Sequence, residues 1–175
     1  MRDKSRPAIV VVMGVSGSGK TTLCRGLEEA FGAARLEGDD FHGAENLGKM
    51  SSGTPLTDED RLPWLRDINA QLHSMTEPGG GGKRVVVLAC SALKDSYRKE
   101  IERGFSRGEL RWVHLACDEA TLARRMRERS HFMPPSLLES QIETLEPPEA
   151  ENCIRLDATR PVSELVERVR RELQP

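Results

Sequence analysis

Cysteine is sparse and without pattern in this sequence of 175 residues. Cys24, Cys90, Cys117 and Cys153 lie far apart and form no C-x-x-C pair. This spacing disfavours a disulfide framework and a zinc site, and it predicts buried thiols in a reduced compartment. An N-terminal apolar run of six residues, 8–13, is too short for a signal core or a membrane span, so we expect a cytoplasmic protein with no membrane contact.

An excess of basic residues is also missing. The formal net charge is -2, and the chain has only four Phe, two Trp and one Tyr. Proteins that bind nucleic acid need a basic surface, and those that bind single strands also need aromatic platforms for the bases. The composition therefore disfavours a nucleic-acid partner, including a kinase that acts on nucleic acid. No internal repeat is visible, so the length predicts one domain over residues 1–175.

A glycine-rich loop is the strongest positive signal. Residues 14–21 fit the phosphate-loop pattern G-x-x-x-x-G-K-[ST], with an apolar strand over 8–13 before it. A helical pattern of Leu23, Leu27 and Phe31 follows, and Gly32 stands where a C-terminal cap belongs. Such a loop turns its backbone N–H groups toward an anion at a helix N-terminus. We therefore expect the loop to bind the phosphates of ATP, through Gly14, Val15, Ser16, Gly17, Ser18, Gly19, Lys20, Thr21 and Thr22.

Two side chains of the loop have predicted roles of their own. Lys20 should reach the outer phosphates, and the Thr21 hydroxyl should bind Mg²⁺. The alternative, a Gly/Ser-rich turn without a ligand, does not explain why strand, loop and helix are in register.

Strand-like and helix-like runs alternate along the chain. Short apolar runs predict strands at 8–13, 33–36, 84–90, 110–116 and 153–156, with helices between them. One helix should begin at Thr57, where Thr57 and Asp60 form a capping-box pattern, and 41–55 reads as an irregular loop. The alternation predicts an α/β fold, a parallel sheet with helices on both faces. Ligands of such sheets bind beyond the carboxyl ends of the strands.

Acidic residues follow the second strand and not the third. Glu37, Asp39 and Asp40 come after 33–36, whereas the strand at 84–90 ends in Cys90 and Ser91. A P-loop motor or switch would carry an acid at that strand end, and a guanine-binding switch would carry an N/T-K-x-D segment, which is missing. Acids after the second strand could receive a substrate hydroxyl beside the γ-phosphate. A plain Gly/Asp turn is the alternative.

The arginines allow two interpretations. Arg61 could form a solvated ion pair or grip a carboxylate or phosphate, and His42 could be surface or substrate contact. Arg124, Arg125, Arg127 and Arg129 could be a solvated helix face or part of an arginine-bearing lid over the nucleotide, at about 124–136.

Several segments together resemble the gluconokinases of the P-loop type, within the shikimate-kinase-like and nucleoside-monophosphate-kinase-like enzymes. They are the phosphate loop, G-D-D-F-H at 38–42, D-E-D-R-L-P-W-L at 58–65, C-S-A-L-K at 90–94, Tyr97-Arg98, H-F-M-P at 131–134 and the stretch 140–147. The resemblance spans nearly the whole chain.

The resemblance implies a P-loop NTPase fold of three α/β/α layers with five parallel strands and a small lid. It implies transfer of the ATP γ-phosphoryl group to the 6-hydroxyl of D-gluconate with Mg²⁺, and frequent homodimers. Asp39 then orients or deprotonates the acceptor hydroxyl, and Glu37 stands near Mg²⁺, through water. Arg61 and Arg98 become candidates for binding the sugar-acid carboxylate. Arg61 lies in a substrate-side excursion at 38–78, and Arg98 follows the strand that ends at residue 90. The remaining assignments are His42, Ser91, Lys94 and His131 for the substrate, and Arg125 and Arg129 for the lid.

The chain departs from the family pattern at two places. Gly43 replaces the usual Pro after His42, which should loosen that loop, and the lid segment at 129–132 is one residue short. A kinase for another small polyol acid or a shikimate-like substrate, and a nucleotide-binding module without transfer activity, remain as alternative interpretations.

Overall fold

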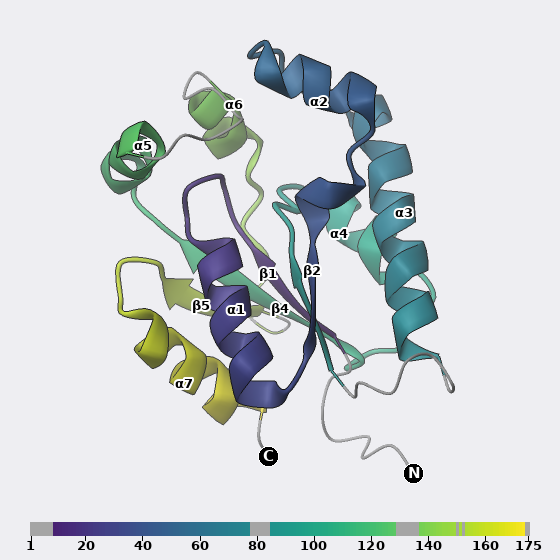
Figure 1. The fold of residues 1–175 in the computed structure, drawn as a ribbon, viewed down its shortest axis with the longest axis vertical. Helices are drawn as coiled ribbons and strands as arrows, with labels where there is room; N and C mark the ends of the chain where they lie inside the picture. Colours follow the sequence, from purple (N-terminus) through teal and green to yellow (C-terminus); the bar gives the residue numbers. More distant parts are fainter. Residues whose placement is uncertain (1–8, 78–84, 129–136, 150, 152, 174–175) are drawn as a thin grey trace.

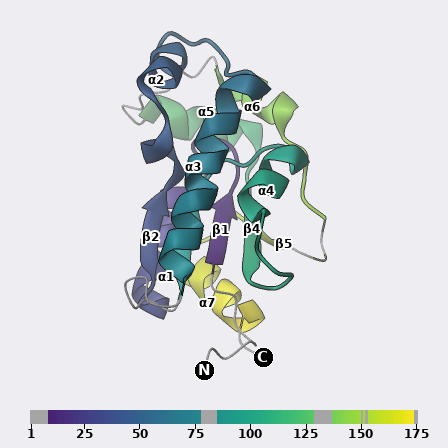
Figure 2. The ribbon, with the colours of Figure 1, turned by 90° about the vertical axis from the view of Figure 1, so that its right-hand side faces the viewer.

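The fold is a five-stranded parallel sheet between two layers of helices (Figures 1 and 2). The structure is a computed structural model, and it describes residues 9–77, 85–128, 137–149, 151 and 153–173. Its elements are β1 (Ile9–Met13), α1 (Lys20–Phe31), β2 (Ala34–Glu37), the 3₁₀ helix η1 (Gly38–Phe41), α2 (Ala44–Ser51), α3 (Asp58–Thr76), β3 (Val86–Ala89), α4 (Asp95–Glu102), β4 (Leu110–Ala116), α5 (Glu119–Glu128), α6 (Leu137–Thr144), β5 (Cys153–Asp157) and α7 (Val162–Leu173).

The strand order is β2-β3-β1-β4-β5, and every neighbouring pair is parallel. The central strand is therefore β1, where Val12 is in register with Ala89 of β3 and with Val113 of β4. This order confirms the predicted parallel sheet. It also places the loop after β1 at the middle of the carboxyl edge, with the ends of β3 and β2 on one side.

β1 is buried on both faces because its side chains alternate between two cores. Ile9, Val11 and Met13 pack with residues of α3 and α4, whereas Val10 and Val12 pack with residues of α1 and α7. An uninterrupted apolar strand suits this position, since both of its faces are covered by helices. Figure 1 shows α1 and α7 on one side of the sheet and α3 on the other.

The predicted capping box at the start of α3 is present. The amide of Asp60 donates to Thr57 Oγ1 at 3.1 Å, and the amide of Thr57 donates to Asp60 Oδ2 at 3.0 Å. These bonds satisfy backbone donors that the first helical turn leaves unpaired. They fix the start of the helix that carries Arg61 and Trp64.

The prediction of an irregular loop over 41–55 was wrong, because this stretch contains the end of η1 and the helix α2. Contacts with other parts of the chain hold α2: Asn46 Nδ2 donates to the Asp60 carbonyl at 2.8 Å, Lys49 Nζ lies 2.7 Å from Asp60 Oδ1, and Met50 packs against Leu137 of α6. A smaller difference is that Cys117 is only partly buried. In the described part of the chain, no helix has the length and apolar character needed to cross a membrane.

Candidate functional site

The phosphate loop connects β1 to α1 in a conformation that requires glycine. Gly14 has φ +148°, and a Cβ there would lie 2.9 Å from the Leu115 carbonyl oxygen. Gly19 is the N-cap of α1 in the left-handed region, with φ 101°. The Ser18 hydroxyl is buried and has no hydrogen-bond partner among the described residues. The loop thus presents a helix N-terminus and an unsatisfied hydroxyl, both suited to an anion.

Lys20 is held across the loop. Its Nζ donates to the Val15 carbonyl oxygen at 3.1 Å. Burial lowers the pKa of Lys20, and the strongest opposing influence is the negative charge of Asp39. Asp39, on the turn that follows β2, and Lys20 therefore lie at the same carboxyl edge of the sheet.

Thr21 and Glu37 come together beside Lys20. The Thr21 hydroxyl donates to Glu37 Oε2 at 3.0 Å, and Arg35 forms an ion pair with the same carboxylate. Hydroxyl and carboxylate oxygens are the ligand types that Mg²⁺ prefers, and Mg²⁺ usually completes its shell with water and phosphate oxygens. No cluster of three or more His, Cys, Asp or Glu that could hold a metal occurs within the described ranges. This pair of donors therefore fits an ion shared with a nucleotide better than a dedicated protein cage.

Asp39 lies on a turn that contacts with Trp64 hold in place. The turn is η1, and the indole nitrogen of Trp64 donates to the carbonyl oxygen of Gly38 at 2.7 Å. His42 ends the turn and stacks on Trp64, with ring centroids 4.3 Å apart. The His42 Nδ1 atom is buried without a partner in the described structure, and burial lowers the pKa of this imidazole while Asp39 raises it and Arg61 lowers it further. The exposed Asp39 carboxylate is therefore carried by a rigid support.

The loop between β3 and α4 lies beside the phosphate loop and forms another part of the site. The Ser91 carbonyl oxygen accepts a hydrogen bond from the Gly14 amide at 3.3 Å. Ala92 has φ 44°, the one positive φ outside glycine in the described residues, and it is fully buried. The buried Arg98 donates through Nη1 to the carbonyl oxygens of Ala92 and Leu93, at 3.0 and 3.2 Å. The guanidinium of Arg98 is thus engaged in holding this strained loop.

The remaining predicted substrate residues gather around Tyr97. The Arg61 guanidinium lies 5.4 Å from the ring centroid and the Lys94 ammonium 5.6 Å from it. Lys94 also pairs with Asp58 at 2.8 Å, and the Tyr97 hydroxyl donates to the same carboxylate. Arg61 Nε is buried and lacks a partner within the described part of the chain. Of these side chains, Arg61 is the one with an unsatisfied donor.

On the other side of the phosphate loop, Arg125 of α5 contacts two loops. Its Nη1 donates to the Ser18 carbonyl at 3.2 Å, and its Nη2 donates to the Ala158 carbonyl at 2.9 Å. Arg124 and Arg127 of the same helix are exposed. Arg129 and His131, two further predicted site residues, lie outside the described residues.

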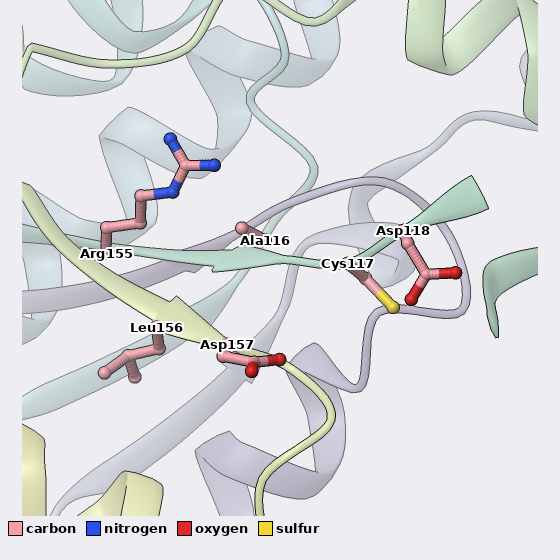
Figure 3. Close-up of a pocket in the computed structure, with 6 residues that line it drawn as sticks. All are labelled: Ala116, Cys117, Asp118, Arg155, Leu156 and Asp157. Atoms are coloured by element: carbon pink, nitrogen blue, oxygen red, sulfur yellow. The ribbon is translucent and has the colours of Figure 1, made fainter. Parts of the chain in front are cut away.

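A cavity of about 400 Å³ opens beyond the carboxyl ends of β4 and β5. It is lined by Ala116, Cys117, Asp118, Arg155, Leu156 and Asp157. Figure 3 shows Arg155 extending toward one end and Cys117, Asp118 and Asp157 gathered at the other. Apolar and polar groups therefore line the same opening, next to the loop that Arg125 contacts.

Sequence reasoning missed Trp64, Tyr97 and Gln141 as parts of the site. Gln141 of α6 bonds to Ser16 of the phosphate loop across 125 positions of sequence. Both Trp64 and Tyr97 lie in the segments of family resemblance, which was the available signal. Their roles as supports under Asp39 and Arg61 depend on tertiary contacts that no local pattern reveals.

Comparison with known proteins agrees with this geometry. A family model described as an AAA domain matches residues 9–148. The gluconokinase of Gluconobacter oxydans is 42% identical over 174 residues, covering 97% of this chain and 93% of that protein. The solved gluconokinase of Sinorhizobium meliloti has a TM-score of 0.82 and 44% identity, covering 95% of this chain and 91% of the other. An unliganded sugar kinase of Janibacter has a TM-score of 0.86 and 40% identity, covering 97% and 96%. With a phosphate loop, an adjacent carboxylate and this degree of similarity over nearly its whole length, the chain belongs to the gluconokinase family.

Proposed function

We propose that this protein transfers the γ-phosphoryl group of ATP to the 6-hydroxyl of D-gluconate, giving 6-phospho-D-gluconate and ADP. Membership of the gluconokinase family supports the reaction class. The observation that carries the proposal is that the phosphate loop follows β1 and the turn with Asp39 follows β2, at the same carboxyl edge of the sheet. An acceptor hydroxyl held by Asp39 would therefore face the γ-phosphate.

In this proposal the two substrates occupy different parts of the carboxyl edge of the sheet, and the strand order β2-β3-β1-β4-β5 supports this division. The phosphates of ATP lie over the end of β1, and the acceptor lies over the ends of β3 and β2, where Asp39 and Ser91 are found. The nucleoside then extends over β4 and β5, toward the cavity beside Arg125. ATP and gluconate thus approach each other from opposite sides along the carboxyl edge.

The chemical step is an in-line displacement. The 6-hydroxyl oxygen forms a bond to the γ-phosphorus while the bond to the β–γ bridging oxygen breaks, and ADP leaves with that electron pair. Asp39 accepts the hydroxyl proton. Lys20 and the backbone amides of the loop stabilise the charge on the phosphate oxygens. Thr21 would hold Mg²⁺, with Glu37 beside it, and the ion would neutralise phosphate charge.

Arg61 is our choice for the carboxylate of gluconate. Its Nε is an unsatisfied buried donor, whereas Arg98 already donates to two backbone carbonyls. A guanidinium beside an aromatic ring is well oriented to grip a carboxylate. His42 and Lys94 lie close to it and could contact the polyol chain. Arg61→Ala should raise KM for gluconate while leaving KM for ATP unchanged. Arg66→Ala is the matched control, because Arg66 lies one turn further along α3 in an exposed pair with Glu100.

Turnover on a panel of sugar acids tests the reaction itself. Purified protein with ATP and Mg²⁺ should release ADP with D-gluconate, and turnover on another acid in place of gluconate would reject the proposed substrate. Asp39→Asn should keep ATP affinity and lose roughly a hundredfold or more in kcat, whereas the matched variant Asp40→Asn should remain active. Lys20→Ala should weaken both ATP binding and transfer.

Assembly as a homodimer is a further part of the proposal, taken from the family. Sedimentation velocity at micromolar concentration would measure it directly.

A further inference from the structure

Helix α6 contacts the phosphate loop at the Val15–Ser16 peptide group. The amide nitrogen of Ser16 donates to Gln141 Oε1 at 2.7 Å, and Gln141 Nε2 donates to Ser16 Oγ at 3.2 Å. Gln141 is buried, with 9% of its surface exposed. Leu138, on the same helix, packs with Val15 in one cluster. Burial of Gln141 and packing of α6 against Val15 therefore hold the Gln141 side chain beside the loop.

The peptide group between Val15 and Ser16 also contacts Lys20, through its carbonyl oxygen. Its carbonyl oxygen, that of Val15, accepts from Lys20 Nζ at 3.1 Å and from the Ser18 amide at 3.3 Å. Since a peptide unit is planar, fixing the N–H direction also fixes the C=O direction. A rotation of the Val15–Ser16 peptide would carry away the oxygen that Lys20 contacts.

We propose that Gln141 is a positioning residue for phosphoryl transfer, which orients the Val15–Ser16 peptide so that its carbonyl holds Lys20 in place. Gln141 acts through Lys20 and does not touch the nucleotide itself. The proposal rests on phosphate binding by the loop, and not on gluconate as the acceptor. A neutral amide suits the position, because it accepts from the backbone N–H and donates to the Ser16 hydroxyl in the same orientation.

A double-mutant cycle tests the proposal. The affinity of a non-hydrolysable ATP analogue is measured by calorimetry for the unmodified protein, Gln141→Leu, Lys20→Ala and the double variant. We expect Gln141→Leu to weaken binding about tenfold when Lys20 is present, and less than about twofold when Lys20 is absent, because residues that act as a unit are not additive. Equal effects in the two backgrounds, or no effect in either, would overturn the proposal.

Two further variants separate positioning from loss of structure. Glu143→Ala changes an exposed residue of the same helix and should leave affinity unchanged in both backgrounds. If Gln141→Leu does not fold, Gln141→Asn replaces it, since this amide is one methylene too short to reach Ser16. The melting temperature is recorded for each protein. If Gln141 has only a structural role, Gln141→Leu should lower the melting temperature, and its effect on affinity should be the same with and without Lys20. Because no acceptor is present, failure of gluconate as substrate would not affect the result.

Discussion

The indole nitrogen of Trp64 donates a 2.7 Å hydrogen bond to the carbonyl oxygen of Gly38, the residue immediately before Asp39. The bond connects helix α3 to the turn that carries the Asp39 carboxylate. The His42 ring stacks on the same indole, nearly parallel to it at 15°. A buried side chain thus holds the turn that carries an exposed carboxylate.

Trp64→Phe should separate this support from nucleotide binding. The substitution leaves the buried Gly38 carbonyl without its donor, at a cost of about 1–3 kcal/mol in unfolding free energy. We expect kcat to fall roughly tenfold through misplacement of Asp39, with ADP affinity retained. Trp112→Phe is the control, because Trp112 is also buried and donates to Glu102 away from the site. Equal losses of kcat in the two variants would contradict the prediction.

Gly43→Pro should stabilise the protein, because glycine at this position is expected to loosen the loop. Gly43 has φ -69° and ψ 164°, values that proline adopts, and a Cβ there would meet nothing within 4 Å. His42 before it is extended, as a residue preceding proline must be. Reduced freedom of the unfolded chain should add about 0.4–1 kcal/mol, measured by urea denaturation. Gly32→Ala gives the contrast: at φ 60° it should destabilise the protein by about 1 kcal/mol.

Ala92→Gly should stabilise the folded state or leave it unchanged. The left-handed conformation costs a buried alanine about 1–2 kcal/mol, a cost that glycine avoids. The greater freedom of glycine in the unfolded chain offsets part of this gain in stability. The same substitution at Ala89, in the regular part of β3, should instead destabilise. Denaturation midpoints of the two variants compare them, and a similar loss in both would show that Ala92 carries no strain.

Acid should destabilise the fold through His114. Burial lowers its pKa from 6.5 to about 4, with contributions from the charges of Arg155 and Arg98. Between these values the unfolded chain binds a proton that the folded protein excludes, so unfolding free energy falls as pH decreases from 6.5 to about 4. The full loss is about 3 kcal/mol. His114→Gln should flatten this part of the curve of stability against pH, and an unchanged slope would assign the acid sensitivity to other groups.

The elements that were predictable from sequence are those with a strong local signal. The phosphate loop, the capping box at Thr57 and the buried strand β1 each combine a pattern with a physical requirement. Helix α2 lacks such a signal: its eight residues include Gly48, and Leu47 is exposed. Helices this short depend on tertiary contacts, here with Asp60 and Leu137. Likewise, the sequence suggested both Arg61 and Arg98 for the carboxylate, and only the fold shows that Arg98 is occupied by backbone carbonyls.

The central position of β1 has a consequence for biosynthesis. Both of its partners come from the later part of the chain, since Ile9 is in register with Val86 on one side and with Leu110 on the other. A ribosome that has translated only residues 1–80 therefore holds a hydrophobic strand whose two neighbours have not been made. Chaperones that shield nascent chains would meet this protein early, with its nucleotide-binding segment still unfolded.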